Sequence, residues 1–238
     1  MYVLRNSANI GWKNTCPPFN LSPEAPFIVD QNTRVGLYYD LANYLPDKSS
    51  RYQFDTFYIP RKRLDYLLTK RQLDGVVVGV NPIWFKDKNE HKYLWLGSIY
   101  EDRDEFVSLK TNTFEFNGLA SLHGLSIAGV SGYYYHGVND IVGKGLAVRV
   151  NTFGEQQILS MLQKKRAHVG IVSSSVFKFL KLQESLPGIY HFSRVPHDAF
   201  KRRMFTSKKH KRIHQHLEPI VASMAKDKVW FEMIANYQ

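Results

Sequence analysis

The sequence predicts an α/β protein built from two lobes. Segments with the alternating pattern of a β-strand and segments with the 3.6-residue period of a helix follow one another in the first half of the chain, and again in the second half. The chain has 238 residues, which is enough for two small lobes. No low-complexity linker separates the halves, so we expect ordered strands to connect two lobes that each have a sheet.

The first half contains five predicted elements. Gly36 precedes a segment in which Leu37 and Leu41 fall on one helical face. Pro60 suits the first turn of a helix, and the apolar residues 75–80 are typical of a strand buried on both faces of a parallel sheet. We therefore expect strands over residues 2–7, 52–59 and 75–80, and helices over residues 37–45 and 60–70.

The second half repeats the alternation. Thr152 and Glu155 have the spacing of a capping box, in which two side chains bind the free backbone N–H groups at the start of a helix. Pro187 and Gly188 mark the end of a later helical segment. We expect strands over residues 125–130, 146–150 and 169–172, and helices over residues 153–166, 176–182 and 208–237.

The charge balance is unusual. The 32 Lys and Arg residues exceed the 21 Asp and Glu residues by 11, which gives a formal net charge of +11. This excess suits a protein that binds nucleic acid, an anionic membrane surface or an acidic ligand. Seven of the cations lie within residues 201–212, with no acidic residue among them. Such a run is usually a solvated helix face, so we expect no nucleic-acid partner.

Several kinds of site are absent from the sequence pattern. Cys16 is the only cysteine, which excludes an internal disulfide and a four-cysteine zinc site. His210 and His214 have the i, i+4 spacing of a metal pair, although such residues more often extend a solvated face. No phosphate-binding or dinucleotide-binding glycine pattern occurs at a strand–helix junction. We expect no cofactor, no metal site, no catalytic residue and no transmembrane helix.

The order and spacing of several motifs resemble those of one family. In the first half they are Pro17-Pro18-Phe19, Gly36-Leu-Tyr-Tyr-Asp-Leu-Ala, Pro60-x-x-Arg63, Leu73-Asp74-Gly75 and Ser98-Ile99-Tyr100. In the second half they are the segments 124–132 and 162–172. Together these motifs span nearly the whole chain, which resembles the bacterial extracellular solute-binding proteins of polar amino acid ABC importers.

The resemblance implies a type II periplasmic-binding-protein fold, with two mixed sheets flanked by helices and a two-strand hinge. Lobe 1 would comprise residues 1–103 and the C-terminal helices of residues 204–238, and lobe 2 would comprise residues 104–203. It also implies a monomeric periplasmic protein, its leader peptide removed, that captures a small polar ligand in a cleft between the lobes. The ligand would be an amino acid or a related organic anion, and the closed form would be presented to an ABC permease in the inner membrane.

In lobe 1, the resemblance assigns the arginine position that binds a ligand carboxylate to Lys86, and a neighbouring serine position to Asn81. Lysine keeps the charge but lacks the planar fork of arginine. The alternative, that Lys86 is an ordinary lysine in an exposed turn, is equally open. Three aromatic residues near the opening of lobe 1 are candidates to hold a planar or apolar part of the ligand: Phe19, Trp84 and Phe85.

In lobe 2, the resemblance assigns a glycine turn at a helix start to Gly132, Tyr133 and Tyr134, where backbone N–H groups favour an anionic group. Ordinary packing accounts for each tyrosine equally simply. The aspartate that pairs with the ligand ammonium in amino-acid binders is replaced by Ser173, and a hydroxyl does not neutralise a buried cation. The ligand would then lack a free amino group or find another acceptor for it. The cationic and aromatic character of the expected cleft favours an organic anion over a standard amino acid.

Other function classes share this architecture. A few members of the fold family are enzymes, but the sequence shows no positioned acid–base pair, so we expect no enzyme. Transcription regulators carry the two lobes behind a DNA-binding helical region, whereas this chain starts at the first strand. An extracellular ligand-sensing domain fits the same features, and it is the alternative to transport.

Overall fold

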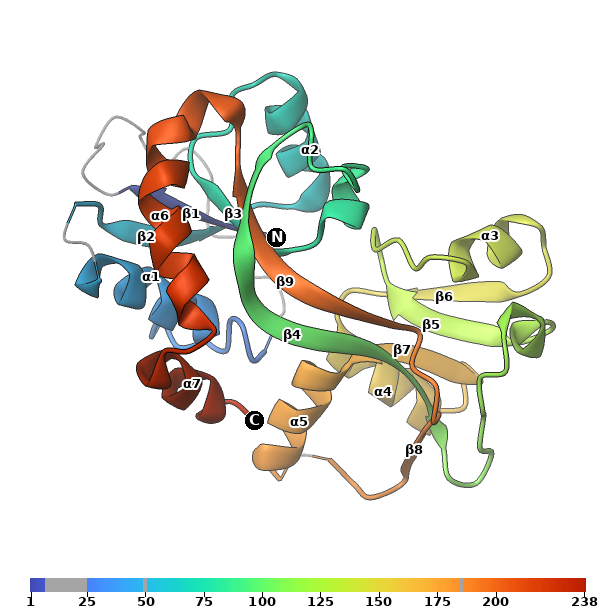
Figure 1. Cartoon of the computed structure of the whole chain (residues 1–238). Coiled ribbons are helices and arrows are strands. Elements are labelled where there is room, and N and C mark those ends of the chain that lie inside the picture. The colour runs from blue at the N-terminus through green and yellow to red at the C-terminus, as the bar shows by residue number, and fades with distance from the viewer. Residues whose placement is uncertain (7–24, 49–50, 185) are drawn as a thin grey trace. The chain divides into compact units, whose positions relative to one another are not determined.

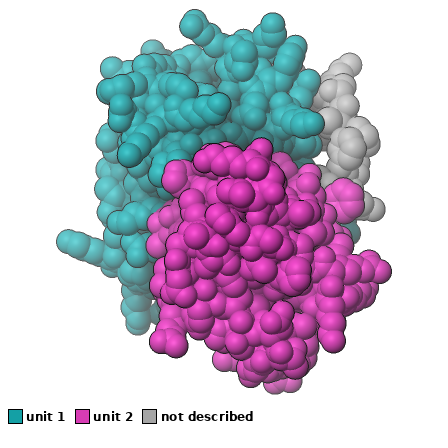
Figure 2. All heavy atoms as spheres, turned by 90° about the vertical axis from the view of Figure 1, so that its right-hand side faces the viewer, with its two compact units in different colours: residues 1–101, 201–237 teal, residues 102–200, 238 magenta. Residues whose placement is uncertain are grey.

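The chain forms two compact units in a computed structural model that describes residues 1–6, 25–48, 51–184 and 186–238. Unit 1 comprises Met1–Glu101 and Lys201–Tyr237, and unit 2 comprises Asp102–Phe200 together with Gln238 (Figure 2). Two strands carry the chain out of unit 1 and back into it. They are β4, Leu94–Leu109, and β9, Asp198–Thr206 (Figure 1).

Unit 1 contains helices and strands from both ends of the chain. They are β1 (Tyr2–Asn6), α1 (Leu37–Asp47), β2 (Phe54–Tyr58), α2 (Arg61–Thr69), β3 (Val76–Val80), the 3-10 helices η1 (Pro82–Phe85) and η3 (Lys208–His210), α6 (Lys211–Met224) and α7 (Lys228–Ala235). The expected starts of α1 and α2 are confirmed, because Gly36 and Pro60 are their N-cap residues. The helical segment expected over residues 208–237 is divided into η3, α6 and α7. Asp227 caps the start of α7 by accepting a hydrogen bond from the N–H of Val229 at 2.8 Å.

The strands of unit 1 pair in antiparallel fashion. β1 lies between β2 and β3, and β3 also pairs with β9. All five residues of β3 are buried, but the expectation of a parallel sheet here is wrong. Side chains from two helices cover the strand, since Tyr38 of α1 reaches Gly79, and Leu64 of α2 packs in one cluster with Val77. Cover by helices, rather than strand direction, therefore explains the apolar run.

Unit 2 contains a three-stranded parallel layer. Its elements are η2 (Leu119–Leu122), β5 (Ser126–Val130), α3 (Val138–Gly143), β6 (Val148–Thr152), α4 (Glu155–Gln163), β7 (Val169–Ser173), α5 (Ser174–Leu182) and β8 (Tyr190–Phe192). β5 pairs in parallel with β6 on one side and β7 on the other. Ile158 and Leu162 of α4 are fully buried against this layer, in a cluster that includes Ala128 of β5 and Val172 of β7.

Nine strands of the described residues form one mixed sheet, and the expectation of two separate sheets is corrected. The path is β2-β1-β3-β9-β4-β7-β5-β6, and β8 pairs with β4. The two long strands account for this continuity. β9 pairs with β3 in unit 1, β4 pairs with β7 in unit 2, and β9 and β4 are neighbours. No helix among the described segments is long and apolar enough to cross a membrane.

Candidate functional site

The carboxyl ends of three parallel strands in unit 2 lie at one edge of the sheet. β5 ends at Val130, β6 at Thr152 and β7 at Ser173. In open α/β sheets, ligands bind outside the carboxyl ends of the strands, because the loops that follow them hold exposed backbone and polar groups there. This edge brings together four of the residues expected to bind ligand, namely Gly132, Tyr133, Tyr134 and Ser173.

A carboxylate meets the end of β7. Glu155, the first residue of α4, accepts hydrogen bonds from the backbone N–H of Ser173 at 2.6 Å and from its hydroxyl at 2.7 Å. Ser173 is buried, with 2% of its surface exposed. The negative charge that the sequence lacks at position 173 is therefore supplied by Glu155. Sequence analysis missed this residue as part of the site.

Glu155 does not form the expected capping box. The N-cap residue of α4 is Gly154, and no side chain caps it. The hydroxyl of Thr152 instead donates to the carbonyls of Gly129, at 3.4 Å, and Gly154, at 3.0 Å. The prediction is wrong because the two donors of Ser173 attract the Glu155 carboxylate away from its own helix. The pattern did mark Glu155 as significant, but for a local role.

A second carboxylate lies at the start of α5. Asp102 accepts hydrogen bonds from the backbone N–H of Ser175 at 3.1 Å and from its hydroxyl at 2.7 Å. Both residues are buried. Carboxylates at the amino end of a helix interact favourably with the helix dipole. Ser173, at the end of β7, and Ser175, in α5, thus each donate a backbone N–H and a hydroxyl to a carboxylate. Ser173 donates to Glu155, and Ser175 donates to Asp102.

The turn after β5 differs from expectation, because α3 begins at Val138 and not at Gly132. Tyr135 explains the difference. Its buried hydroxyl accepts a hydrogen bond from the N–H of Val130 at 3.0 Å, and its ring packs directly on Gly129, where a Cβ would lie 2.6 Å from the ring. Burial raises the pKa of Tyr135 well above its ordinary value. The chain folds back over β5 before it turns into a helix.

This turn presents two backbone donors. Within the described parts of the chain, the N–H groups of Gly132 and Tyr134 form no hydrogen bond, and both residues are exposed. Gly132 has φ +82, a backbone conformation that favours glycine. Tyr134 is 54% exposed and its hydroxyl donates to Asp140 at 3.3 Å, whereas Tyr133 packs against both buried clusters of unit 2. The N–H of Tyr133 between them donates to the carbonyl of Val130 at 3.1 Å. The two free N–H groups are therefore separate donors that an anion can accept from.

An exposed aromatic side chain lies at the same edge. Phe153 directly follows β6 and is 84% exposed, and its N–H donates to the side-chain oxygen of Gln157 at 2.9 Å. A single exposed apolar side chain is common on a protein surface. The place of Phe153 directly after β6, beside the other strand ends, makes it a candidate to cover a ligand. Sequence analysis missed Phe153 because it assigned this segment to the capping box alone.

The candidate residues of unit 1 lie on and beside η1. The Asn81 side chain caps this 3-10 helix, since its oxygen accepts from the N–H of Ile83 at 3.0 Å. Phe85 is 6% exposed and its ring contacts Phe205 with ring centroids 4.9 Å apart, so it belongs to the core of unit 1. Trp84 is partly buried at the edge of the same cluster.

Lys86 follows η1 and is exposed. Its backbone is left-handed, with φ 52, and its side chain forms no ion pair with any residue in the described ranges. This placement leaves the charge available to a ligand and equally fits an ordinary surface lysine. Phe19 lies outside the described residues.

The paired histidines, His210 at the end of η3 and His214 in α6, do not form a metal site. The Nε2 atom of His210 lies 3.3 Å from the carbonyl of Leu73, and that of His214 lies 2.9 Å from the carbonyl of Trp95. The two rings are therefore directed to different strands and loops. A search of the described residues for groups of three or more metal-ligating side chains finds none.

Solved structures match this fold over nearly the whole chain, whereas no family model and no curated protein matches the sequence. A mutant of the arginine-binding protein ArgBP from T. maritima has a TM-score of 0.69 at 15% identity, over 91% of this chain and 92% of that one. The GluR0 ligand-binding core from Nostoc punctiforme, in complex with L-glutamate, has a TM-score of 0.69 at 10% identity, over 90% and 94%. The substrate-binding protein of an amino acid ABC transporter has a TM-score of 0.64 at 15% identity, over 91% and 96%.

These matches are ligand-binding proteins and not enzymes, in agreement with the expectation from the sequence. Identities of 10 to 15% establish the arrangement of the chain and leave its ligand to be argued from its own residues. The expected fold class is confirmed, whereas the expected division into two sheets is not. The chain has the fold of the type II periplasmic binding proteins, which transport-associated amino-acid-binding proteins share with the GluR0 ligand-binding core.

Proposed function

We propose that this protein binds a free amino acid and serves as the solute-binding component of an ABC importer. The observation that carries the proposal is the Glu155 carboxylate at the end of β7, beside a turn after β5 with free backbone N–H groups. The two features offer opposite charges at one edge of a sheet. A zwitterion is the small ligand that such an arrangement recognises.

The contacts follow from the charges. The ligand ammonium pairs with Glu155, whose carboxylate already binds Ser173 and whose negative charge offsets the cost of burying a cation. The ligand carboxylate accepts hydrogen bonds from the N–H groups of Gly132 and Tyr134. The role of Lys86 stays a prediction from the sequence. Phe153 covers the apolar part of the ligand.

Glu155 changes the preferred class of ligand. With serine alone at the end of β7, a ligand without an ammonium group would be favoured. With a carboxylate bound to that serine, an amino acid is favoured. The related structures support the same class, since ArgBP is named for arginine and the GluR0 core is bound to L-glutamate.

Sensing is the second candidate role. The match to the GluR0 ligand-binding core favours it, because the same fold there forms a ligand-binding core in complex with L-glutamate that is not named as part of a transporter. For transport we propose a monomer, exported to the periplasm, that docks on an inner-membrane ABC permease. Uptake of the radiolabelled ligand by cells that lack the gene distinguishes the roles. Lost uptake supports transport, and unchanged uptake with a lost response to the ligand supports sensing.

A thermal-shift screen of the free amino acids tests the ligand class. A tight ligand raises the melting temperature by mass action. Calorimetric titration of the best ligand into Glu155→Gln then tests the site. Loss of a charge-assisted hydrogen bond should weaken binding by about tenfold or more.

Glu218→Gln is the matched control, because Glu218 is an exposed glutamate on α6 and its substitution changes the net charge equally. We expect it to bind the ligand like the natural protein. The melting temperature of each variant without ligand shows whether it is folded. If no amino acid raises the melting temperature, or if Glu155→Gln binds as tightly as Glu218→Gln, the proposal is wrong.

A further inference from the structure

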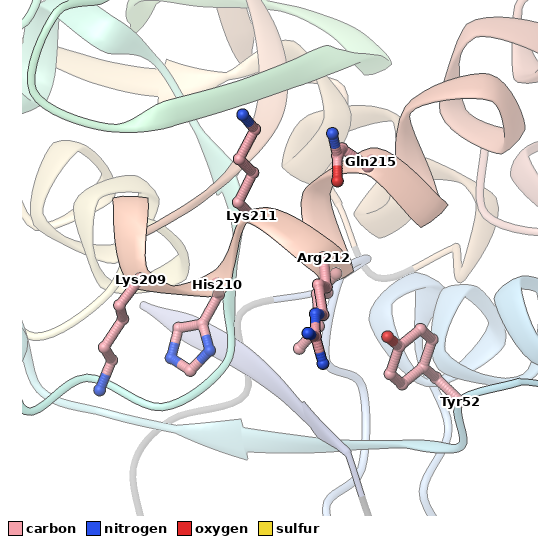
Figure 3. Close-up of a pocket in the computed structure, with 7 residues that line it drawn as sticks. Tyr52, Lys209, His210, Lys211, Arg212 and Gln215 are labelled. Carbon is pink, nitrogen blue, oxygen red and sulfur yellow. The ribbon is translucent and has the colours of Figure 1, made fainter.

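A pocket of about 660 Å³ opens at the start of α6, within unit 1. Its lining includes Tyr52, which precedes β2, and four successive residues of η3 and α6, Lys209 to Arg212 (Figure 3). We call it the α6 pocket. Its volume lies in the range of small-molecule sites, and nothing in the proposed amino-acid site accounts for it.

The cations around the α6 pocket lack counter-ions. Four exposed cations form no ion pair with any described residue: Lys208, Lys209, Lys211 and Arg212. The acid that approaches this segment is Asp74, whose Oδ1 lies 3.2 Å from the Nε2 of His210. One carboxylate against this many cations leaves a large local excess of positive charge.

This arrangement is unfavourable without a ligand. Lys208 and Lys209 lie in η3, and Lys211 and Arg212 begin α6, so four positive charges lie within five residues and repel one another. The first turn of α6 contains no acidic residue, although the amino end of a helix favours negative charge. An anion in the pocket relieves both effects at once.

Three side chains that line the pocket extend to one side of the chain. In Figure 3, Lys209, His210 and Arg212 extend to the same side of the chain, and the ring of Tyr52 lies beside Arg212. Lys211 extends to the opposite side. The Tyr52 ring is held by an edge contact with His216, with ring centroids 4.9 Å apart. The pocket therefore combines a guanidinium, an ammonium and a phenol hydroxyl.

We propose that the α6 pocket binds a phosphorylated ligand through Arg212, Lys209 and Tyr52. The planar guanidinium of Arg212 pairs with two oxygens of one phosphate, and Lys209 supplies a second positive charge. The Tyr52 hydroxyl donates to a phosphate oxygen. A phosphate group carries more charge and more acceptor oxygens than a carboxylate, so it compensates a cluster of cations better. This site lies in unit 1 and is independent of the proposed amino-acid site.

Calorimetric titration with tripolyphosphate tests the site on the full chain. Two double variants remove the same charge from the same segment. Lys209→Ser with Arg212→Ser removes two lining cations whose side chains extend to the same side of the chain. Lys208→Ser with Lys211→Ser removes one cation that does not line the pocket and one lining residue whose side chain extends to the opposite side. We expect the first double variant to lose about tenfold or more in affinity and the second to lose much less.

Two further titrants identify what the site recognises. Citrate carries several carboxylates and no phosphate, and we expect it to bind far more weakly than tripolyphosphate. Vesicles that contain phosphatidylglycerol present phosphate as a lipid headgroup. If tripolyphosphate binds and the vesicles do not, the ligand is a soluble phosphorylated molecule. If the protein sediments with the vesicles and tripolyphosphate releases it, the ligand is a lipid headgroup.

Either source supports the site. Three results would overturn it: no binding of tripolyphosphate or vesicles, equal affinity for citrate, or equal losses in the two double variants. Equal losses would show a diffuse positive surface rather than a pocket. Melting temperatures of both double variants without titrant confirm that they are folded. Relief of charge repulsion predicts that neither variant is less stable than the natural protein.

Discussion

Glu155 and Ser173 show that the role of a residue cannot always be inferred from its neighbours in sequence. The type and position of Glu155 indicated a helix cap, and those of Ser173 indicated a missing charge. Both interpretations changed when β7 was found beside the start of α4, because the serine donors and the carboxylate then meet at 2.6 and 2.7 Å. Contacts between residues 18 apart in sequence depend on the strand order.

Gly79 provides a test at the residue scale. Its φ is +71, and a Cβ there would lie 1.6 Å from the hydroxyl oxygen of Tyr38. Gly79→Ala should therefore both strain the backbone and overpack the contact with α1. Gly124→Ala is the matched control, since Gly124 has φ +74 and nothing lies within 4 Å of its Cβ position.

Overpacking of a core costs about 1–3 kcal/mol, so Gly79→Ala should lower the free energy of unfolding by that much more than Gly124→Ala. Urea denaturation measures both values. Equal losses in the two variants would mean that Tyr38 moves aside and that the contact does not determine the residue type at position 79.

At the scale of elements, local signals predicted most helices and strands, because caps and periodicity act within a few residues. The helices that begin after Gly36 and Pro60 are examples. The C-terminal segment was predicted to be helical throughout because its apolar period continues past residue 225, so the break between α6 and α7 was not placed. The break there depends on Asp227, which caps α7. Asp227 also accepts a hydrogen bond from Tyr44 of α1 at 2.9 Å and forms an ion pair with Lys48, directly after α1, at 2.9 Å.

Asp227 predicts a pH dependence of the α1–α7 contact. The pKa of Asp227 is lowered to about 2, mainly by the hydrogen bond from Lys48. Burial acts in the opposite direction and has a smaller effect. Hydrogen bonds from Tyr44 and from the N–H groups of Val229 and Trp230 also lower the pKa. A carboxyl whose pKa is lower in the folded than in the unfolded chain stabilises the fold above its unfolded pKa of about 3.9. This stabilisation is lost as the pH falls from about 4 toward 2.

Asp227→Asn keeps a good capping side chain and removes the charge. We expect its melting temperature to lie below that of the natural protein at pH 6, and the gap to close as the pH falls to 2. Asp47→Asn is the control, since Asp47 is an exposed acid at the end of α1 with no ion pair among the described residues. A constant gap between pH 6 and pH 2 would contradict the assignment of the effect to the Asp227 charge.

At the scale of the whole molecule, each unit has a buried cluster of its own. Leu64 belongs to a cluster of unit 1 and Ile158 to a cluster of unit 2, and the two clusters share no residue. Both side chains are fully buried. Leu64→Ala and Ile158→Ala should each lower the free energy of unfolding by about 2–5 kcal/mol, through lost burial and the cavity left behind.

The double variant tests whether the clusters are energetically separate. Changes at sites without shared partners add to within about 0.5 kcal/mol. We expect the loss in the Leu64→Ala, Ile158→Ala double variant to equal the sum of the single losses, measured by urea denaturation at one pH and salt concentration. A clear departure from the sum would show that the two cores are coupled through β4 and β9.

The sequence by itself determined the class of fold, the positions of most elements and the residues at the strand ends, because these depend on periodicity, caps and turn residues that act locally. The tertiary structure decided which of those residues work together. It showed that β3 pairs in antiparallel fashion and that one sheet runs through β9 and β4. It also showed that α3 starts only after Tyr135 has folded over β5, and that Glu155 accepts a hydrogen bond from Ser173 at the end of β7. Strand order and side-chain direction arise from long-range packing, which leaves no local pattern to recognise.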